Sequence, residues 1–221
     1  MAVEMFFSHL LFYLVITSAF FCFIISLVKT IKKKDGLLLL ITLYYFFSVT
    51  ISTSSLIIEE HNSSRILMTC LYLFYTYDIV LFLLVTGKRK NGSLRFYILI
   101  LILVSTPILI ATYNSNNFIK NYYHEIVYQL LIALLTTPTI ISLYMKPEAD
   151  FVKTEFEFWF ISAFFLFSTV TSLTYIVDYS IGLLYSRNAN SFLPEIQSTV
   201  LAMVWVVKYF LLLKAVLCRK T

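Results

Sequence analysis

Two ionisable residues, Asp78 and Lys208, lie inside long apolar stretches of the sequence, where a charge is costly and marks either a pair or a functional site. Counted from the outer ends of the helices predicted below, Asp78 is residue 13 and Lys208 is residue 14. At the rise of an α-helix, both lie about 18–20 Å below the outer surface. We therefore predict that they pair. Tyr75 and Trp205 lie three residues before them, on the same helix faces, and complete the predicted site.

Two interpretations of this pair stay open. A buried ion pair can fix the register of packed helices without adding stability. Alternatively, the pair is a proton or ligand site beneath a polar, outward-facing cavity. Serine and threonine side chains in the outer halves of two predicted helices could line this cavity, but such hydroxyls more often bond to their own helix or across to another. The side chains in question are Ser48, Ser52, Ser55, Ser168, Thr171 and Ser172.

Other chemistry has little support in the sequence. The histidines, His9, His61 and His124, lie near acidic residues but lack the spacing of a metal site. There is no Gly-x-Ser-x-Gly turn, and no two carboxylates share one depth in the predicted helices. We therefore expect no enzymatic activity, no cofactor and no bound metal.

Composition predicts the elements that position these residues. Of 221 residues, 60% are hydrophobic and 13% are charged, and the mean hydropathy is +0.85. An average soluble domain has about 25% charged residues. A chain this apolar cannot cover its surface with polar side chains. We therefore predict an all-α integral membrane protein in contact with the lipid bilayer.

Apolar stretches of 18 to 24 residues predict a bundle of seven transmembrane helices in a single domain over residues 1–221. No connection between them exceeds 17 residues, so we expect no soluble domain between spans. The first span is too long for the core of a signal peptide, and we expect it to be retained. The predicted spans are 5–28, 37–58, 66–86, 96–113, 123–145, 158–177 and 195–217.

The basic residues predict the orientation. Thirteen of the 17 follow the first, third, fifth and seventh spans or lie in the last turn of the seventh, and three lie in the opposite loops. By the positive-inside rule, the N-terminus lies outside and the C-terminus lies in the cytoplasm. We expect a bacterial cytoplasmic (inner) membrane, with anionic inner-leaflet lipids as partners of the basic loops. The positive charge is thus a topology signal, and we expect no nucleic-acid binding.

A carboxylate in the third span and a lysine in the seventh give a layout that resembles that of microbial rhodopsins. The resemblance implies that Lys208 carries retinal as a Schiff base and that Asp78 is its counterion. The chain departs from the family at Val204, where a carboxylate is expected. It also lacks a proline in span 158–177 and the arginine-containing motif at the start of the third span.

Over its whole length, the chain also resembles the uncharacterised short seven-helix membrane proteins of Bacteroidota, which are often encoded near sensor kinases. The matching segments are Phe158-Trp159-Phe160-Ile161 and Leu217-Cys218. This resemblance implies a signalling context, with a membrane or cytoplasmic signalling partner. We expect a non-enzymatic sensory or accessory protein. The alternatives are a small transporter or channel that uses the Asp78–Lys208 pair, and a retinal-binding, rhodopsin-like protein.

Overall fold

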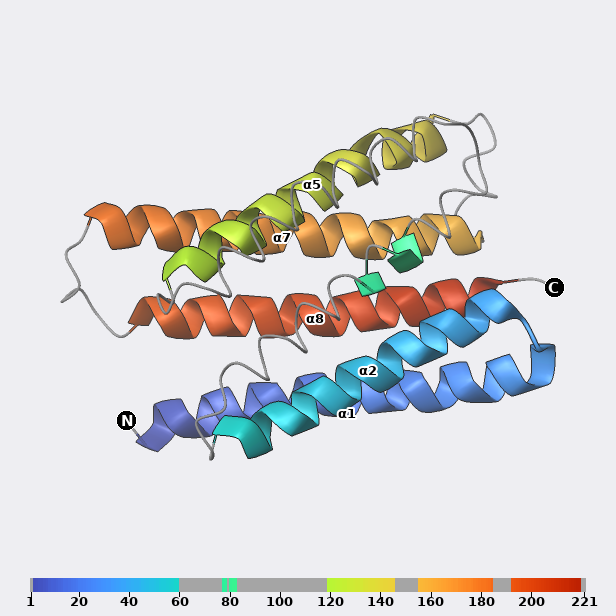
Figure 1. The fold of residues 1–221 in the computed structure, drawn as a ribbon, viewed down its shortest axis with the longest axis horizontal. Helices are drawn as coiled ribbons and strands as arrows, with labels where there is room; N and C mark the ends of the chain where they lie inside the picture. The colour runs from blue at the N-terminus through green and yellow to red at the C-terminus, as the bar shows by residue number, and fades with distance from the viewer. Residues whose placement is uncertain are drawn as a thin grey trace.

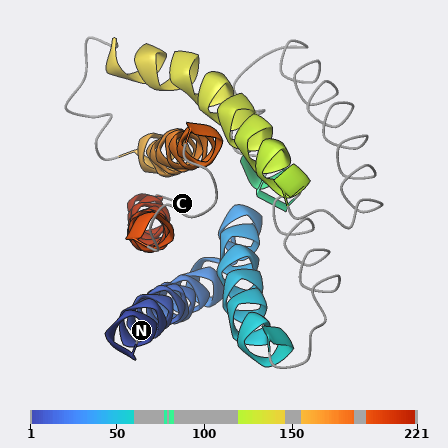
Figure 2. The same cartoon turned by 90° about the vertical axis from the view of Figure 1, so that its left-hand side faces the viewer.

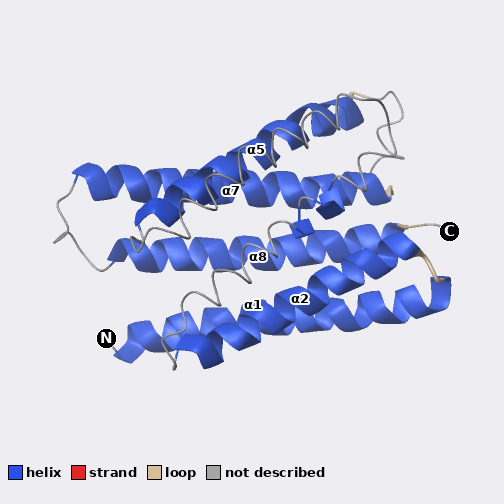
Figure 3. Ribbon diagram, viewed as in Figure 1, coloured by secondary structure: helices blue, strands red, loops and turns tan. Residues whose placement is uncertain are grey.

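The computed structural model describes residues 2–59, 77–78, 80–82, 119–145, 155–184 and 192–219. Within these ranges, every regular element is an α-helix (Figure 3). The long helices are α1 (Ala2–Lys33), α2 (Gly36–Glu59), α5 (Ile119–Tyr144), α7 (Phe156–Leu184) and α8 (Phe192–Cys218). The predicted spans 66–86 and 96–113 lie outside the described residues, except for 77–78 and 80–82.

Four of these helices are long and apolar enough to cross a membrane. Helix α5 contains a shorter apolar helix, Tyr128–Tyr144. The predicted span 123–145 is helical as far as Tyr144. The four candidate spans are His9–Lys33, Gly36–Ser54, Phe156–Val177 and Gln197–Cys218.

The helices extend beyond the predicted spans. Helix α7 continues past Val177, through Asp178 and Ser180, to Leu184. Polar residues end an apolar span, but they do not end a helix, because its backbone hydrogen bonds do not depend on side-chain polarity. Helix α1 likewise extends on both sides of the predicted span 5–28.

A tight turn joins α1 to α2. Lys34 has a φ of 51°, and its N–H donates to the carbonyl oxygen of Thr30 at 2.8 Å, which ends α1 with a left-handed residue. The Asp35 carboxylate then accepts a hydrogen bond from the N–H of Leu37 at 2.9 Å and caps the start of α2. The two helices are therefore antiparallel neighbours (Figure 1).

Viewed along the bundle, the helices follow an arc in the order α2, α1, α8, α7, α5 (Figure 2). Residues 77–78 and 80–82, here the 77–82 segment, lie between α2, at one end of the arc, and α7. The Tyr77 hydroxyl donates to the carbonyl oxygen of Leu40 in α2 at 2.7 Å. The Phe82 ring packs on Phe164 of α7, with centroids 5.6 Å apart. This segment therefore bridges α2 and α7.

One end of the bundle, here the Lys29 end, contains the C-terminal ends of three helices. Lys29 of α1 donates to the last carbonyl oxygens of α8. The Arg219 guanidinium, just after α8, lies 5.0 Å from the ring of Phe156 at the start of α7. Tyr144, at the end of α5, packs on Phe158 with centroids 5.6 Å apart. Helices α1, α5 and α8 therefore run toward this end, and α2 and α7 run away from it (Figure 1).

Apolar side chains cover the outside of the bundle, and polar ones occur inside it. Phe21, Ile31 and Leu134 are 53%, 66% and 68% exposed, whereas Thr42 and Gln129 are buried. Exposed apolar surface of this extent is unfavourable in water and favourable in lipid. The protein is therefore membrane-embedded and contacts lipid.

Candidate functional site

Lys208 of α8 and Asp78 of the 77–82 segment form a buried ion pair. The Lys208 Nζ atom donates to the Asp78 Oδ2 atom at 2.7 Å, and the two side chains are 0% and 1% exposed. Lys208 is the twelfth of the 22 residues in the candidate span Gln197–Cys218, so the pair lies near the middle of that span. The structure thus brings together the two residues that the sequence predicts to pair.

Four aromatic rings surround the Lys208 ammonium. Its Nζ atom lies 4.2 Å from the ring centroid of Phe167, 4.7 Å from Phe164, 5.0 Å from Trp205 and 5.2 Å from Tyr44. Ring faces attract cations, more strongly where water is excluded. Together with the Asp78 carboxylate, these rings replace part of the hydration that a buried ammonium loses. We call the four rings and the carboxylate the aromatic cage.

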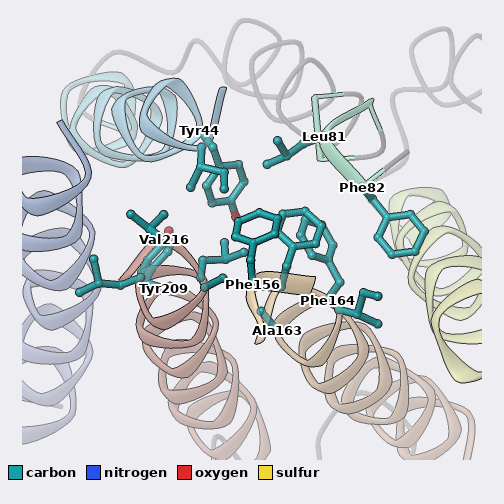
Figure 4. Close-up of a cluster of buried hydrophobic side chains, with 14 of the residues drawn as sticks. Tyr44, Leu81, Phe82, Phe156, Ala163, Phe164, Tyr209 and Val216 are labelled. Carbon is teal, nitrogen blue, oxygen red and sulfur yellow. The ribbon is translucent and has the colours of Figure 1, made fainter. Parts of the chain in front are cut away.

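Helices α2, α7 and α8 each contribute to this cage. Phe164 and Phe167 are three residues apart on one face of α7, and Trp205 precedes Lys208 by one turn of α8. Tyr44 enters from α2. Figure 4 shows Tyr44 and Phe164 directed into the interior between these helices, with Tyr209 of α8 beside them.

The second carboxylate oxygen of Asp78 has a different environment. In the described part of the chain, Asp78 Oδ1 is buried without a hydrogen-bond partner. The same holds for the hydroxyl of Thr171 in α7. An unsatisfied buried acceptor costs about 1–3 kcal/mol. Among the described residues, Lys208 therefore satisfies one of the two carboxylate oxygens of Asp78.

Four of the side chains predicted to line the outward-facing cavity are buried in the helix bundle. Ser48, Ser168, Thr171 and Ser172 are at most 3% exposed. Ser168 and Ser172 donate to the carbonyl oxygens three residues earlier in α7, at 3.2 and 2.9 Å. Ser48 shares a hydrogen bond with the hydroxyl of Tyr209. Ser48, Ser168 and Ser172 therefore have hydrogen-bond partners inside the bundle, whereas the Thr171 hydroxyl has none among the described residues. The cavity itself stays a prediction.

The structure describes some, but not all, of the other residues predicted to form the site. Ser52 is half-buried in α2. Tyr75 and the side chain of Ser55 lie outside what the structure describes, so their predicted roles stay predictions. Trp205 contacts Lys208 as expected from its position one turn earlier.

The sequence does not single out the tyrosines next to the pair. The Tyr45 hydroxyl donates to the carbonyl oxygen of Tyr209 at 2.8 Å and links α2 to α8. Tyr44, Tyr45 and Tyr209 are all at most 1% exposed. Tyrosines of membrane proteins usually lie near the interfaces. These three tyrosines instead lie in the middle of two candidate spans. This position in the sequence could have distinguished them from interfacial tyrosines.

A second polar cluster lies at the Lys29 end. Lys29 donates to the carbonyl oxygens of Val216 and Leu217, the latter at 2.8 Å, and Lys33 donates to that of Arg219 at 3.1 Å. Arg219 also pairs with Asp35. Cationic side chains stabilise helix C-termini because the last carbonyl groups lack partners in the helix. The cluster therefore attaches the end of α8 to the α1–α2 turn.

Among the described residues, no three His, Cys, Asp or Glu side chains lie close enough together to bind a metal ion. Comparisons of the chain with protein-family models, with curated proteins and with solved structures give no match. The resemblances to microbial rhodopsins and to the Bacteroidota proteins therefore stay predictions.

Proposed function

We propose that this protein is a non-enzymatic sensory membrane protein in which the Asp78–Lys208 pair is the element that responds to a signal. One observation carries the proposal: the pair is fully buried near mid-span and joins segments that are distant in the sequence. Removal of one partner of a buried pair costs about 3–5 kcal/mol, because the other charge stays uncompensated. Neutralisation or capture of either charge therefore favours a different packing of the helices that the pair joins.

Helix α8 offers a route from this pair to the cytoplasmic side. It carries Lys208, and Arg219 follows its last residue, 11 residues and about 16 Å further along the helix axis. Movement of α8 at Lys208 changes the contacts of Arg219 with Asp35. A membrane or cytoplasmic signalling partner at the Lys29 end detects this change. The pair and the partner surface are two distinct sites, as allosteric coupling requires.

The proposed topology has seven spans, with α5 as one of them and the N-terminus outside. Helix α2 ends, and α5 begins, at the end of the bundle opposite Lys29 (Figure 1). Asp78 lies between them in the sequence and near mid-span in the bundle. Both observations support the two predicted spans 66–86 and 96–113. The basic residues of the Lys29 end support a cytoplasmic position for that end by the positive-inside rule. We propose a bacterial inner membrane, with anionic lipids around these residues.

The alternative function is a small transporter or channel that uses the same pair. The Asp78 Oδ1 atom favours it, because this intramembrane carboxylate oxygen has no hydrogen-bond partner among the described residues, and such a carboxylate suits proton or ion transfer. Purified protein in sealed vesicles separates the two functions. The sensory function predicts no proton or solute flux above that of empty vesicles.

The matched variants for this experiment are Asp78→Asn and Asp35→Asn. Both remove one carboxylate, but only Asp78 lies in the aromatic cage. Proton flux that Asp78→Asn abolishes and Asp35→Asn preserves would contradict the sensory function and support transport. The retinal-binding alternative has its own readout: added retinal would produce a visible absorbance band that Lys208→Met removes.

A further inference from the structure

We infer that the aromatic cage is a binding site for a primary alkylammonium ligand, and that the side chain of Lys208 occupies this site when the ligand is absent. The inference rests on the proposed function in one respect, since it takes the Asp78–Lys208 pair as the responsive element. It adds the chemical class of the ligand and the way in which the ligand competes.

The geometry defines what the cage accepts. The end of a lysine side chain is itself a primary alkylammonium group, and the cage holds it with four rings at 4.2 to 5.2 Å from Nζ. One N–H bond reaches Asp78 Oδ2 at 2.7 Å. The neighbouring Oδ1 atom is buried without a partner in the described part of the chain. A free ammonium group finds the same ring faces and can donate to both carboxylate oxygens.

The same geometry disfavours other cations. A calcium ion takes six to eight oxygen ligands and a magnesium ion keeps a near-octahedral oxygen shell. The cage instead presents ring faces and a single carboxylate. A quaternary ammonium ion suits aromatic rings, but it has no N–H group to donate to Asp78. Its methyl groups also prevent an approach of nitrogen to oxygen at 2.7 Å.

Charge balance determines how the ligand enters. Two ammonium groups beside one carboxylate would leave an uncompensated buried charge, which is strongly unfavourable. The ligand R–NH₃⁺ therefore takes the place of the Lys208 ammonium at Asp78, and Lys208 releases one proton to water and becomes a neutral amine. No other bond forms or breaks. The net charge of the site is zero before and after the exchange.

The released proton comes from Lys208 and not from the groups that surround the pair in the part of the chain that the structure describes. Helix α7 presents the rings of Phe164 and Phe167 to the Lys208 ammonium. Helices α2 and α8 contribute the phenols of Tyr44 and Tyr209, whose rings lie 6.5 Å apart. Within this surrounding, Lys208 is the cationic group, so the released proton is assigned to it.

Chemical rescue tests the site itself. Lys208→Ala removes the resident ammonium and leaves Asp78 uncompensated in the cage. Methylammonium chloride should raise the melting temperature of this variant in detergent, and the effect should saturate with concentration. Tetramethylammonium chloride and sodium chloride at equal concentration should have much smaller effects. The double variant with Asp78→Asn should not respond to methylammonium.

Displacement in the unchanged protein is tested by proton release. Methylammonium, adjusted to the pH of a weakly buffered detergent solution, should release one proton from the protein for each ligand bound. Phe167→Leu should weaken this binding about 5-fold, as expected for one lost ring face. Phe158→Leu is the matched control, because Phe158 is also a buried ring of α7 but packs on Tyr144 and Trp159, which are not part of the cage, and it should leave the affinity unchanged.

Each outcome that would contradict the inference affects a different part of it. Absence of rescue in a folded Lys208→Ala variant, or equal rescue by tetramethylammonium, would overturn the assigned ligand class. Rescue without proton release from the unchanged protein would overturn the displacement and leave the cage as a structural site for Lys208. If Lys208→Ala does not fold, proton release and its response to Phe167→Leu decide alone. Failure of the proposed sensory function appears instead as Asp78-dependent flux across vesicles, which is measured without methylammonium.

Discussion

Lys29 of α1 donates through its Nζ atom to the carbonyl oxygen of Leu217 in α8, at 2.8 Å, although 188 residues separate them. The same ammonium reaches the carbonyl oxygen of Val216. It therefore satisfies backbone groups that the end of α8 leaves without partners. Through this contact, the helix that carries Lys208 is held in parallel beside the first helix of the chain.

Loss of this contact should lower stability. Lys29→Met keeps the aliphatic side chain but leaves the last carbonyl groups of α8 without their cation, which should cost about 1 kcal/mol. The melting temperature in detergent should fall by a few degrees. Lys32→Met, at an exposed position in the same helix end, is the control and should have little effect. Equal losses for the two variants would mean that the contact contributes nothing.

Asp35 makes two contacts, a helix cap and an ion pair, and two different substitutions distinguish their contributions to stability. Its carboxylate accepts from the N–H of Leu37, which caps α2, and pairs with Arg219. Asp35→Asn keeps an acceptor for the cap, whereas Asp35→Ala removes both contacts. The alanine variant should therefore be less stable than the asparagine variant by about 1 kcal/mol. The pair with Arg219 is partly exposed and should contribute less than about 1 kcal/mol. If denaturation gives the same stability for both variants, the cap is not a stabilising contact.

Lys34 offers a stabilising substitution. Its φ of 51° lies in the left-handed region, which costs about 1–2 kcal/mol for a residue with a Cβ atom and little for glycine. Lys34→Gly should therefore raise the free energy of unfolding by up to about 1 kcal/mol after the greater chain entropy of glycine is included. Lys32→Gly, within α1, should lower it by about 0.5–1 kcal/mol. A loss of stability in Lys34→Gly would contradict this reading of the turn.

The contact between Asp78 and Lys208 was predictable because depth can be counted along a helix. Each residue rises by a fixed distance, so two charges at equal counts from the same surface lie at one level. The cage was not predictable in this way. Tyr44 and Phe167 approach Lys208 because α2 and α7 turn particular faces toward α8, and that rotation depends on packing between helices that are distant in the sequence.

The hydrogen bonding of the buried serines and the position of the helix ends could not be predicted from the sequence either. A serine that lines a cavity and a serine that bonds to its own helix have the same sequence pattern, so Ser168 and Ser172 were compatible with both. The extension of α7 beyond Val177 was also hidden, because hydropathy reports where an apolar span ends and not where the helix ends.

The reactivity of the buried Cys22 thiol measures whether the Asp78–Lys208 pair controls the packing of the helices. It is fully buried in α1, whereas Cys218 at the end of α8 is partly exposed, and both are free thiols. In a Cys70→Ser background, Lys208→Met should speed maleimide labelling of Cys22, because an unpaired Asp78 loosens the bundle. Labelling of Cys218 should change little. A folded Lys208→Met variant with slow Cys22 labelling would show that the pair does not control this packing.

The most direct test of the buried pair compares the thermal stability of Lys208→Met alone with that of Lys208→Met combined with Asp78→Asn. The single variant leaves a buried carboxylate without its cation and should lose about 3–5 kcal/mol. The double variant removes both charges and should recover a large part of that loss, because variants of contacting residues are not additive. Melting temperatures of the purified proteins in one detergent provide the measurement. We predict a higher melting temperature for the double variant than for Lys208→Met; an equal or lower one would contradict the pairing of Asp78 with Lys208.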